Sequence, residues 1–167
     1  NPNNANQLYA SVVNSTNGNG GVWVSNNINL NAASTWTKLP NPPRTEGHPF
    51  NIVVLNDGKV VVSYSGHRNP GFTASSGVFL YDPNTNTWAD RSAAGLYYWT
   101  KDVVIDPNDA TQNTWYAGVF SGWGGAANGL GGLYRTTNRG TSWTRINNID
   151  RVTSCTISPN NPNEAYI

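Results

Sequence analysis

The chain has 167 residues, only 11% of them charged, and its formal net charge is +1. A charge so near zero, with no run of Lys or Arg, offers no field for nucleic acid or an anionic membrane, and no apolar stretch nears the length that spans a bilayer. The length predicts one domain. Abundant Asn, Thr, Ser and Gly favour turns and strands over long amphipathic helices.

Short runs rich in β-branched and aromatic residues alternate with clusters of Gly, Pro, Asn and Asp, which predicts strands separated by turns. No window keeps a 3.6-residue apolar period over three turns, so the fold class is all-β. In chain order, the expected strands are residues 7–13, 22–25, 35–39, 52–55, 60–64, 78–81, 87–90, 101–105, 114–120, 133–136, 142–146, 152–157 and 164–167.

The clearest local pattern is residues 131–146, GGLYRTTNRGTSWTRI. Two extended runs flank a polar turn, which predicts a β-hairpin. The Asn138 side chain can accept bonds from nearby backbone N–H groups, Gly140 can adopt a positive φ, and the Trp143 ring can cover the turn or join the core.

The landmarks of this hairpin recur at a period of about 50 to 56 residues, a length typical of a propeller blade or a solenoid turn. A Gly-apolar-aromatic start precedes a closing tryptophan each time, and an Asx-Pro-Asn or similar turn precedes the unit. The starts are at Gly21, Gly77 and Gly132, and the closing residues are Trp36, Trp88 and Trp143.

The repeat predicts a β-propeller of four-stranded antiparallel blades. The expected blades are 1–39 (partial, without its first strand), 46–91, 99–146 and 151–167 (partial). Propellers typically close with 4 to 8 blades, so we expect the chain to be a portion of a six- to eight-bladed ring. The remainder would come from a longer chain or from a second copy, and the missing Met and leader indicate a processed or trimmed chain.

The turn at residues 136–143, Thr-x-Asn-x-Gly-x-Ser-Trp, resembles the Asp-box (BNR) repeat, with Asn138 where that family usually has Asp. The resemblance is to sialidases, xyloglucanase-type glycoside hydrolases, sortilin-like receptors and photosystem-assembly propellers. The turns and aromatic-Ala strands of residues 106–117 and 1–10 are most similar to the xyloglucanase-type and related secreted bacterial propellers. That similarity implies a seven-bladed propeller or a tandem pair, often acting on β-glucans. Neither the sialidase arginine triad nor the family's catalytic aspartates match a motif here.

The longest and most varied loops, 40–49, 67–76, 91–99 and 121–130, fall on one face of the predicted blades, where binding residues usually lie. Exposed aromatic rings beside Gly and Asn suit the flat faces of sugars. The alternative for Trp99 and Trp123 is packing between blades. The predicted substrate-binding residues are Trp123, Trp99, Tyr97, Tyr98, His67 and Arg68.

Glycoside hydrolysis needs two carboxyl groups, about 6.5–9.5 Å apart for inversion or 5–5.5 Å for retention. Asp102 and Glu46 are the catalytic candidates near the loop face. Asp102 would start the inner strand of the third blade, at the place of Ile52 and Ser154 in its neighbours. The alternative for Asp102 is a surface ion pair with Lys101 or Arg91.

No His or Cys has partners at metal-ligand spacing, so the sequence predicts neither a metal nor a cofactor. Cys155 is expected to be a small core residue. The function that these patterns favour is a secreted, carbohydrate-active propeller that binds or hydrolyses a polysaccharide of the β-glucan or xyloglucan kind. The alternative is a non-catalytic scaffold or adhesion propeller that binds protein partners.

Overall fold

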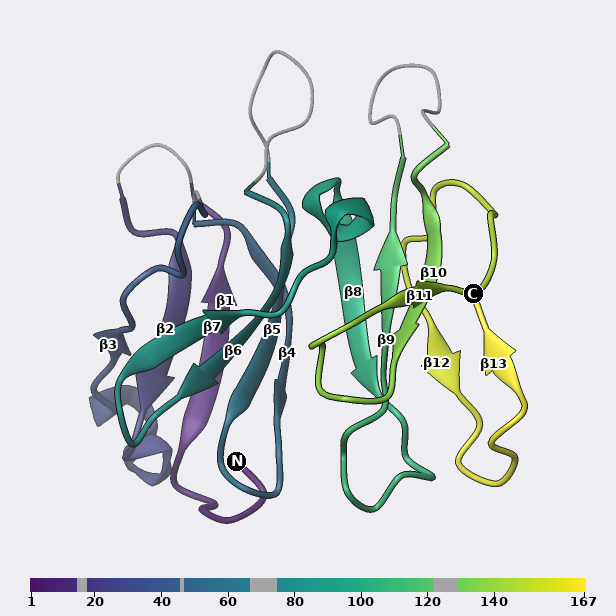
Figure 1. Cartoon of the computed structure of the whole chain (residues 1–167). Coiled ribbons are helices and arrows are strands. Elements are labelled where there is room, and N and C mark those ends of the chain that lie inside the picture. Colours follow the sequence, from purple (N-terminus) through teal and green to yellow (C-terminus); the bar gives the residue numbers. More distant parts are fainter. Residues whose placement is uncertain (15–17, 46, 67–74, 122–128) are drawn as a thin grey trace.

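The computed structural model describes residues 1–14, 18–45, 47–66, 75–121 and 129–167. Antiparallel sheets follow one another along the chain and stand side by side as blades (Figure 1). Helical structure in the described ranges is limited to two 3-10 segments, η1 (Ile28–Ala33) and η2 (Ala94–Tyr97). The all-β propeller fold predicted from the repeat is confirmed.

The blades are numbered 1 to 4 in chain order. Blade 1 contains β1 (Leu8–Val12), β2 (Gly21–Ser25) and β3 (Thr37–Lys38); blade 2 contains β4 (Pro49–Val54), β5 (Val60–Tyr64), β6 (Gly77–Asp82) and β7 (Thr87–Asp90); blade 3 contains β8 (Thr100–Ile105), β9 (Trp115–Val119), β10 (Gly132–Thr136) and β11 (Thr144–Arg145); blade 4 contains β12 (Thr156–Ile157) and β13 (Ala165–Tyr166).

The strand pairings put the blades in a common register. Ala10 pairs with Trp23 in blade 1, as Val62 pairs with Phe79 in blade 2 and Ala117 with Tyr134 in blade 3. Strand β1 therefore corresponds to the second strand of blades 2 and 3. Residues at equal register can be compared directly from blade to blade.

The apolar core lies between the blades, because each sheet is apolar on both faces. The side chains between blades 1 and 2 include Val22, Leu39, Val60, Val62, Tyr64 and Phe79. Those between blades 2 and 3 include Leu55, Val61, Val78, Leu80, Trp115, Ala117 and Tyr134. Those between blades 3 and 4 are Tyr116, Leu133, Cys155 and Ile157.

A glycine begins the third strand of each complete blade for two physical reasons. Gly77 and Gly132 have φ of +151° and +142°, a region that side chains rarely allow. A Cβ atom would also collide with the linker that leaves the blade, at Ser92 for Gly77 and at Asn147 for Gly132. The absence of a side chain at this glycine thus leaves room for the linker that leaves the same blade to pass over the end of the third strand.

The hairpin turn between β10 and β11 has the predicted chemistry. The Asn138 carbonyl Oδ1 accepts a bond from the Ser142 N–H at 2.9 Å, the Gly140 N–H donates to Thr136 Oγ1 at 3.0 Å, and φ of Gly140 is +77°. Trp143 packs against the core between blades 2 and 3, and its indole N–H donates to the Arg91 carbonyl at 2.6 Å.

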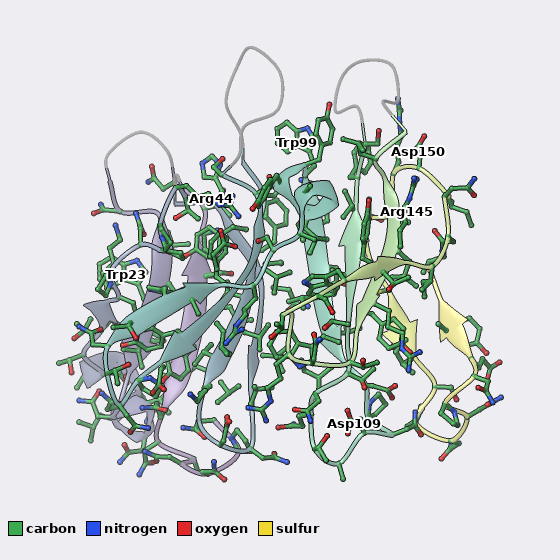
Figure 2. All side chains as sticks on the ribbon, in the orientation of Figure 1. Trp23, Arg44, Trp99, Asp109, Arg145 and Asp150 are labelled. Carbon is green, nitrogen blue, oxygen red and sulfur yellow. The ribbon has the colours of Figure 1, made fainter. Side chains whose placement is uncertain are left out.

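The blades have two distinct ends (Figure 1). The linkers that join successive blades lie at one end, here called the loop face. The turns β4–β5, β6–β7, β8–β9 and β10–β11 lie at the opposite end, here called the turn face. Figure 2 shows Trp99 and Asp150 toward the loop face and Asp109 on the turn face.

Candidate functional site

Four of the residues predicted from the sequence lie outside the described residues: Glu46, His67, Arg68 and Trp123. Their assignment as catalytic or substrate-binding residues stays a prediction. The other predicted residues are all placed by the structure on or under the loop face.

Tyr98 and Trp99 are buried, with 9% and 7% of their surface exposed, so neither forms the open sugar platform expected of it. The cause is the 3-10 turn η2, which folds the linker into the space between blades 2 and 3, where Leu96 is fully buried. The Thr100 hydroxyl holds this turn by donating to the Leu96 carbonyl at 2.6 Å. The alternative that Trp99 packs between blades is confirmed.

Tyr97 is half-buried, and the guanidinium of Arg44 lies over its ring, 4.3 Å from the centroid. Arg44 also bonds to both oxygens of Asp90 and to the Ser76 carbonyl. Burial alone would raise the pKa of Asp90, but the bonds from Arg44 and Ser92 outweigh it and lower that pKa. This cluster fixes the linker between blades 1 and 2 to blade 2, so its groups serve the fold.

Asp102 is buried, and its carboxylate joins three blades. Its Oδ1 accepts a bond from Asn51 Nδ2 at 2.5 Å, and its Oδ2 accepts one from the Cys155 N–H at 2.9 Å. The surface ion pair expected with Lys101 or Arg91 is therefore wrong, because the partners found are neutral groups: Asn51 in the inner strand of blade 2 and Cys155, which directly precedes β12 of blade 4. We call this set the axial brace.

The register also corrects one predicted equivalence. Val103 pairs with Ala117 as Ile52 pairs with Val62, so the residue of blade 2 that corresponds to Asp102 is Asn51, not Ile52. The Asn51 side chain donates to the Val103 carbonyl at 3.0 Å. Polar side chains at this one register position therefore tie successive inner strands together.

A β-bulge interrupts β4 and β8 beside the axial brace, between Pro49 and Ile52 and between Thr100 and Asp102. Bulges re-aim side chains and are common beside active sites. Phe50 and Lys101 lie in the two bulges, and the Lys101 ammonium stands 4.1 Å from the centre of the Phe50 ring. Phe50 is 44% exposed.

Lys101 is also 5.4 Å from the ring of the buried Trp99. Burial lowers the pKa of Lys101 from its usual value. An exposed aromatic ring with an ammonium group beside it thus lies at the loop-face end of the two neighbouring inner strands. The sequence interpretation overlooked Phe50 because it falls between the expected loop 40–49 and the expected strand 52–55, outside any motif.

Asp150 is the remaining described acid near the loop face. It is half-buried, and its Oδ1 has no hydrogen-bond partner among the described residues. The pKa of the Tyr134 hydroxyl is raised, mainly by burial. The nearby Asp150 carboxylate adds to this rise, while the Arg145 guanidinium opposes it. Figure 2 shows Asp150 and Arg145 on the same side of blade 3.

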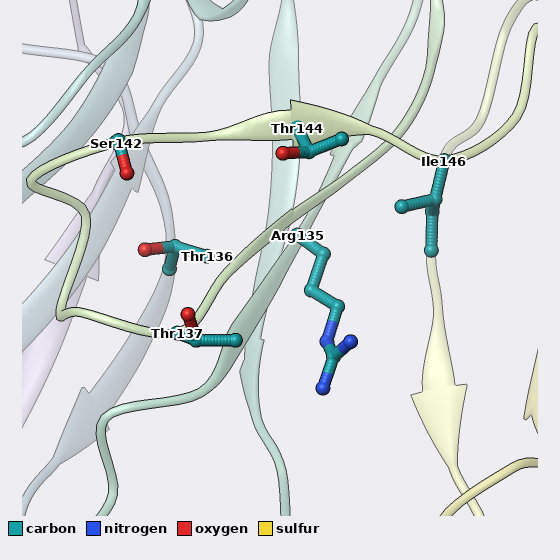
Figure 3. A pocket seen from close by; sticks show the side chains of 6 residues that line it. All are labelled: Arg135, Thr136, Thr137, Ser142, Thr144 and Ile146. Carbon is teal, nitrogen blue, oxygen red and sulfur yellow. The ribbon is translucent and has the colours of Figure 1, made fainter.

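A depression of about 190 Å³ lies on the outer part of blade 3 (Figure 3), lined by Arg135, Thr136, Thr137, Ser142, Thr144 and Ile146. Its hydroxyl groups are partly committed, because Thr136 and Ser142 both bond to Asn138 within the turn. The Arg135 guanidinium lies over the Tyr116 ring at 5.8 Å. This surface is a weaker candidate than the bulges.

The remaining site chemistry in the described ranges is limited. Those residues contain no cluster of three His, Cys, Asp or Glu that could hold a metal ion. Cys155 is buried as predicted, and burial together with Asp102 raises the pKa of its thiol to about 12. No helix among the described residues is long and apolar enough to cross a membrane.

No family model matches the chain. A solved structure, the GH74 xyloglucanase from Xanthomonas campestris, superposes with a TM-score of 0.69 at 19% identity, over 96% of this chain and 24% of that one. The fold is a xyloglucanase-like propeller.

A curated protein with a similar sequence is also a xyloglucanase. A xyloglucanase from a Paenibacillus species is 27% identical over 128 residues, which cover 70% of this chain and 11% of the relative. The chain thus spans about a tenth of the curated relative and about a quarter of the solved one. The xyloglucanase part of the predicted resemblance is supported, while the Asp-box, sialidase and sortilin parts stay predictions.

Proposed function

We propose that this chain is part of a secreted propeller that binds a polysaccharide of the β-glucan or xyloglucan kind on its loop face. The observation that carries the proposal is the pair in the bulges of β4 and β8: Phe50, 44% exposed, and Lys101, 4.1 Å from its ring. A sugar ring has apolar C–H faces and polar edges. Phe50 would stack on the face, and the ammonium would donate to a hydroxyl.

The buried aromatic residues have a supporting role in this proposal. Trp99 lies 5.4 Å from the Lys101 ammonium, and Tyr98 packs in the core beside it, in the linker directly before β8. Trp123, His67 and Arg68 would add contacts from the neighbouring loops. The likeness to two xyloglucanases favours a plant-type β-glucan as the ligand.

Binding is favoured over hydrolysis for the described part of the chain. Asp102 is bonded through both carboxylate oxygens and Asp90 through both of its own, so neither is open to a glycosidic oxygen. A catalytic pair needs two available carboxyl groups. Asp150 and the predicted Glu46 remain as acids for a catalytic hypothesis, which would require the rest of the ring.

The test is retention on immobilised xyloglucan, mixed-linkage β-glucan and cellulose, measured by affinity electrophoresis. Phe50→Ala should weaken retention roughly fivefold, because loss of one aromatic stacking contact is worth about 1 kcal/mol. The matched control is Leu130→Ala, since Leu130 is a similarly exposed apolar residue of the same face but has no ring. A wild-type chain that is retained on none of the three polysaccharides would favour the protein-binding scaffold instead.

A further inference from the structure

The inner segments of blades 2, 3 and 4 align residue by residue: β4, β8 and the stretch that leads into β12. The turn after each segment is closed by a backbone bond of the same kind. Its donors are the N–H groups of Leu55, Asp106 and Ser158, and its acceptors are the carbonyls of Lys59, Thr114 and Glu164. Counted back from these donors, Phe50, Lys101 and Thr153 occupy one register position toward the loop face.

The bonds between blades agree with this alignment. Asn51 of blade 2 donates through its side chain to the Val103 carbonyl of blade 3 at 3.0 Å. Asp102 of blade 3 accepts through its side chain from the Cys155 N–H of blade 4 at 2.9 Å. In both cases one register position meets the backbone of the next blade one position further on. The step from blade 3 to blade 4 therefore repeats the step from blade 2 to blade 3.

The register position of Phe50, Lys101 and Thr153 is open at the loop face. Phe50 is 44% exposed although blade 3 packs against blade 2, so this position is open even where the next blade is in place. Lys101 is half-buried, with its ammonium 4.1 Å from the centre of the Phe50 ring. Thr153 is exposed. Successive blades thus present an aromatic ring, an ammonium group and a hydroxyl group.

The Thr153 hydroxyl differs from other hydroxyl groups near the loop face, because the fold does not use it. The Thr100 hydroxyl donates to the Leu96 carbonyl at 2.6 Å, and the Ser76 hydroxyl oxygen accepts from the Gly66 N–H at 2.7 Å. Among the residues that the structure describes, the Thr153 hydroxyl makes no hydrogen bond. It is therefore available to a ligand that reaches blade 4.

We propose that the polysaccharide site on the loop face extends to blade 4 and that Thr153 is a specificity-determining residue of it. The sugar unit next to the one stacked on Phe50 would lie over Lys101 and Thr153. The Thr153 hydroxyl would hydrogen-bond to a hydroxyl group of that second unit, and it suits a neutral sugar because it can both donate and accept. This inference rests on the proposed function, since it names a further residue of the same site.

The test removes the hydroxyl group of Thr153 without changing the shape of the side chain. Thr153→Val should weaken retention on xyloglucan or mixed-linkage β-glucan about three- to tenfold, which corresponds to the loss of one hydrogen bond. Thr153→Ser keeps the hydroxyl group and should be retained like the wild type. Affinity electrophoresis measures all three chains.

The matched control is Thr156→Val. Thr156 is an exposed threonine of the same inner segment, three residues further from the loop face, and it is outside the row of Phe50, Lys101 and Thr153. Thr156→Val should leave retention unchanged. The thermal unfolding midpoint of each variant should equal that of the wild type, because both threonines are at the surface.

The length of the ligand separates Thr153 from Phe50. Soluble cello-oligosaccharides of increasing length compete with the immobilised polysaccharide for the site. Phe50→Ala should weaken competition by short and long oligosaccharides alike. Thr153→Val should weaken only those long enough to place a second sugar unit over blade 4, because only these reach the hydroxyl group.

The outcomes distinguish this inference from the proposed function. If Phe50→Ala weakens retention and Thr153→Val leaves it unchanged, the inference is overturned and the proposed function stands. Equal losses for Thr153→Val and Thr156→Val would also overturn the inference, because the position of the hydroxyl group would not then matter. A wild-type chain that is retained on no polysaccharide would overturn both.

Discussion

On the turn face, the Asp109 carboxylate accepts bonds from Thr111, Asn113 and Thr114, all within five residues of it. Near the loop face, the Asp102 carboxylate is bonded to Asn51 and Cys155, which are 51 and 53 residues away. The two aspartates have the same chemistry. They differ in that one stabilises a turn locally, while the other joins three blades.

The difference shows that a buried or half-buried carboxylate can stabilise this fold either within one turn or between blades. Asp109 closes its own turn without any contact between blades, since its partners are near in sequence. Other turn-face groups do join blades, as Arg139 does by donating to Asp57, 82 residues away. Asp102 is satisfied only when the blades are assembled, because its partners Asn51 and Cys155 belong to neighbouring blades.

The largest effect is expected from Asp102→Leu. The substitution leaves the Asn51 amide and the Cys155 N–H buried without their acceptor, which should cost about 2–4 kcal/mol of unfolding free energy. Urea denaturation measures it. Asp102→Asn is the control, because it keeps the size and one acceptor oxygen and should cost less. A loss below about 0.5 kcal/mol for Asp102→Leu would restore the view of Asp102 as a surface ion pair.

Asp109→Ala should cost less, about 1–2 kcal/mol, because the N–H groups that it frees are near the surface and can bond to water. The same urea titration measures this, with Asp109→Asn as the conservative variant. If Asp109→Ala proved more costly than Asp102→Leu, the proposed division between local and long-range polar groups would fail.

The indole bonds rank next. Trp143→Phe and Trp88→Phe should each cost about 1 kcal/mol, the net value of one hydrogen bond, since both indoles donate to a linker carbonyl. Trp36→Phe should cost almost nothing in this chain, because Trp36 of blade 1 is 38% exposed and its indole makes no such bond within the described ranges. Thermal unfolding of the three variants makes the comparison. Three equal losses would mean that the indole bonds are not the cause.

The smallest effect is a pH dependence on the turn face. Hydrogen bonds from Thr111 contribute most to holding the pKa of Asp109 well below its usual range. A lowered native pKa stabilises the fold above the unfolded value near 3.9, and this stabilisation is lost as the pH falls through the native pKa. The urea midpoint difference between wild type and Asp109→Asn should therefore be full at pH 6 and shrink below about pH 4. A constant difference would contradict it.

The propeller fold could be predicted because its signals are local and repeated. Gly77 and Gly132 occupy a backbone region that few other residues tolerate, and the Asn138 turn forms from residues within four positions of one another. These constraints act between residues close together in the sequence, so one hairpin and its repeat period were enough to predict the blades.

The candidate site was harder to predict, since the same residue types serve opposite roles there. Trp99 and Tyr98 had the composition of an exposed platform, yet the turn η2 buries them between blades 2 and 3. Phe50 belonged to no motif, yet a bulge at the end of β4 leaves it exposed beside Lys101. Burial depends on which blade lies opposite, and no local pattern encodes that.

The sequence by itself determined the strands, the turns and the repeat, because each depends on backbone preferences and bonds that span a few residues. Only the tertiary structure decided that Asp102 joins blades, that Trp99 is buried and that Phe50 is exposed. The physical reason is that these properties belong to contacts between sheets some fifty residues apart along the chain.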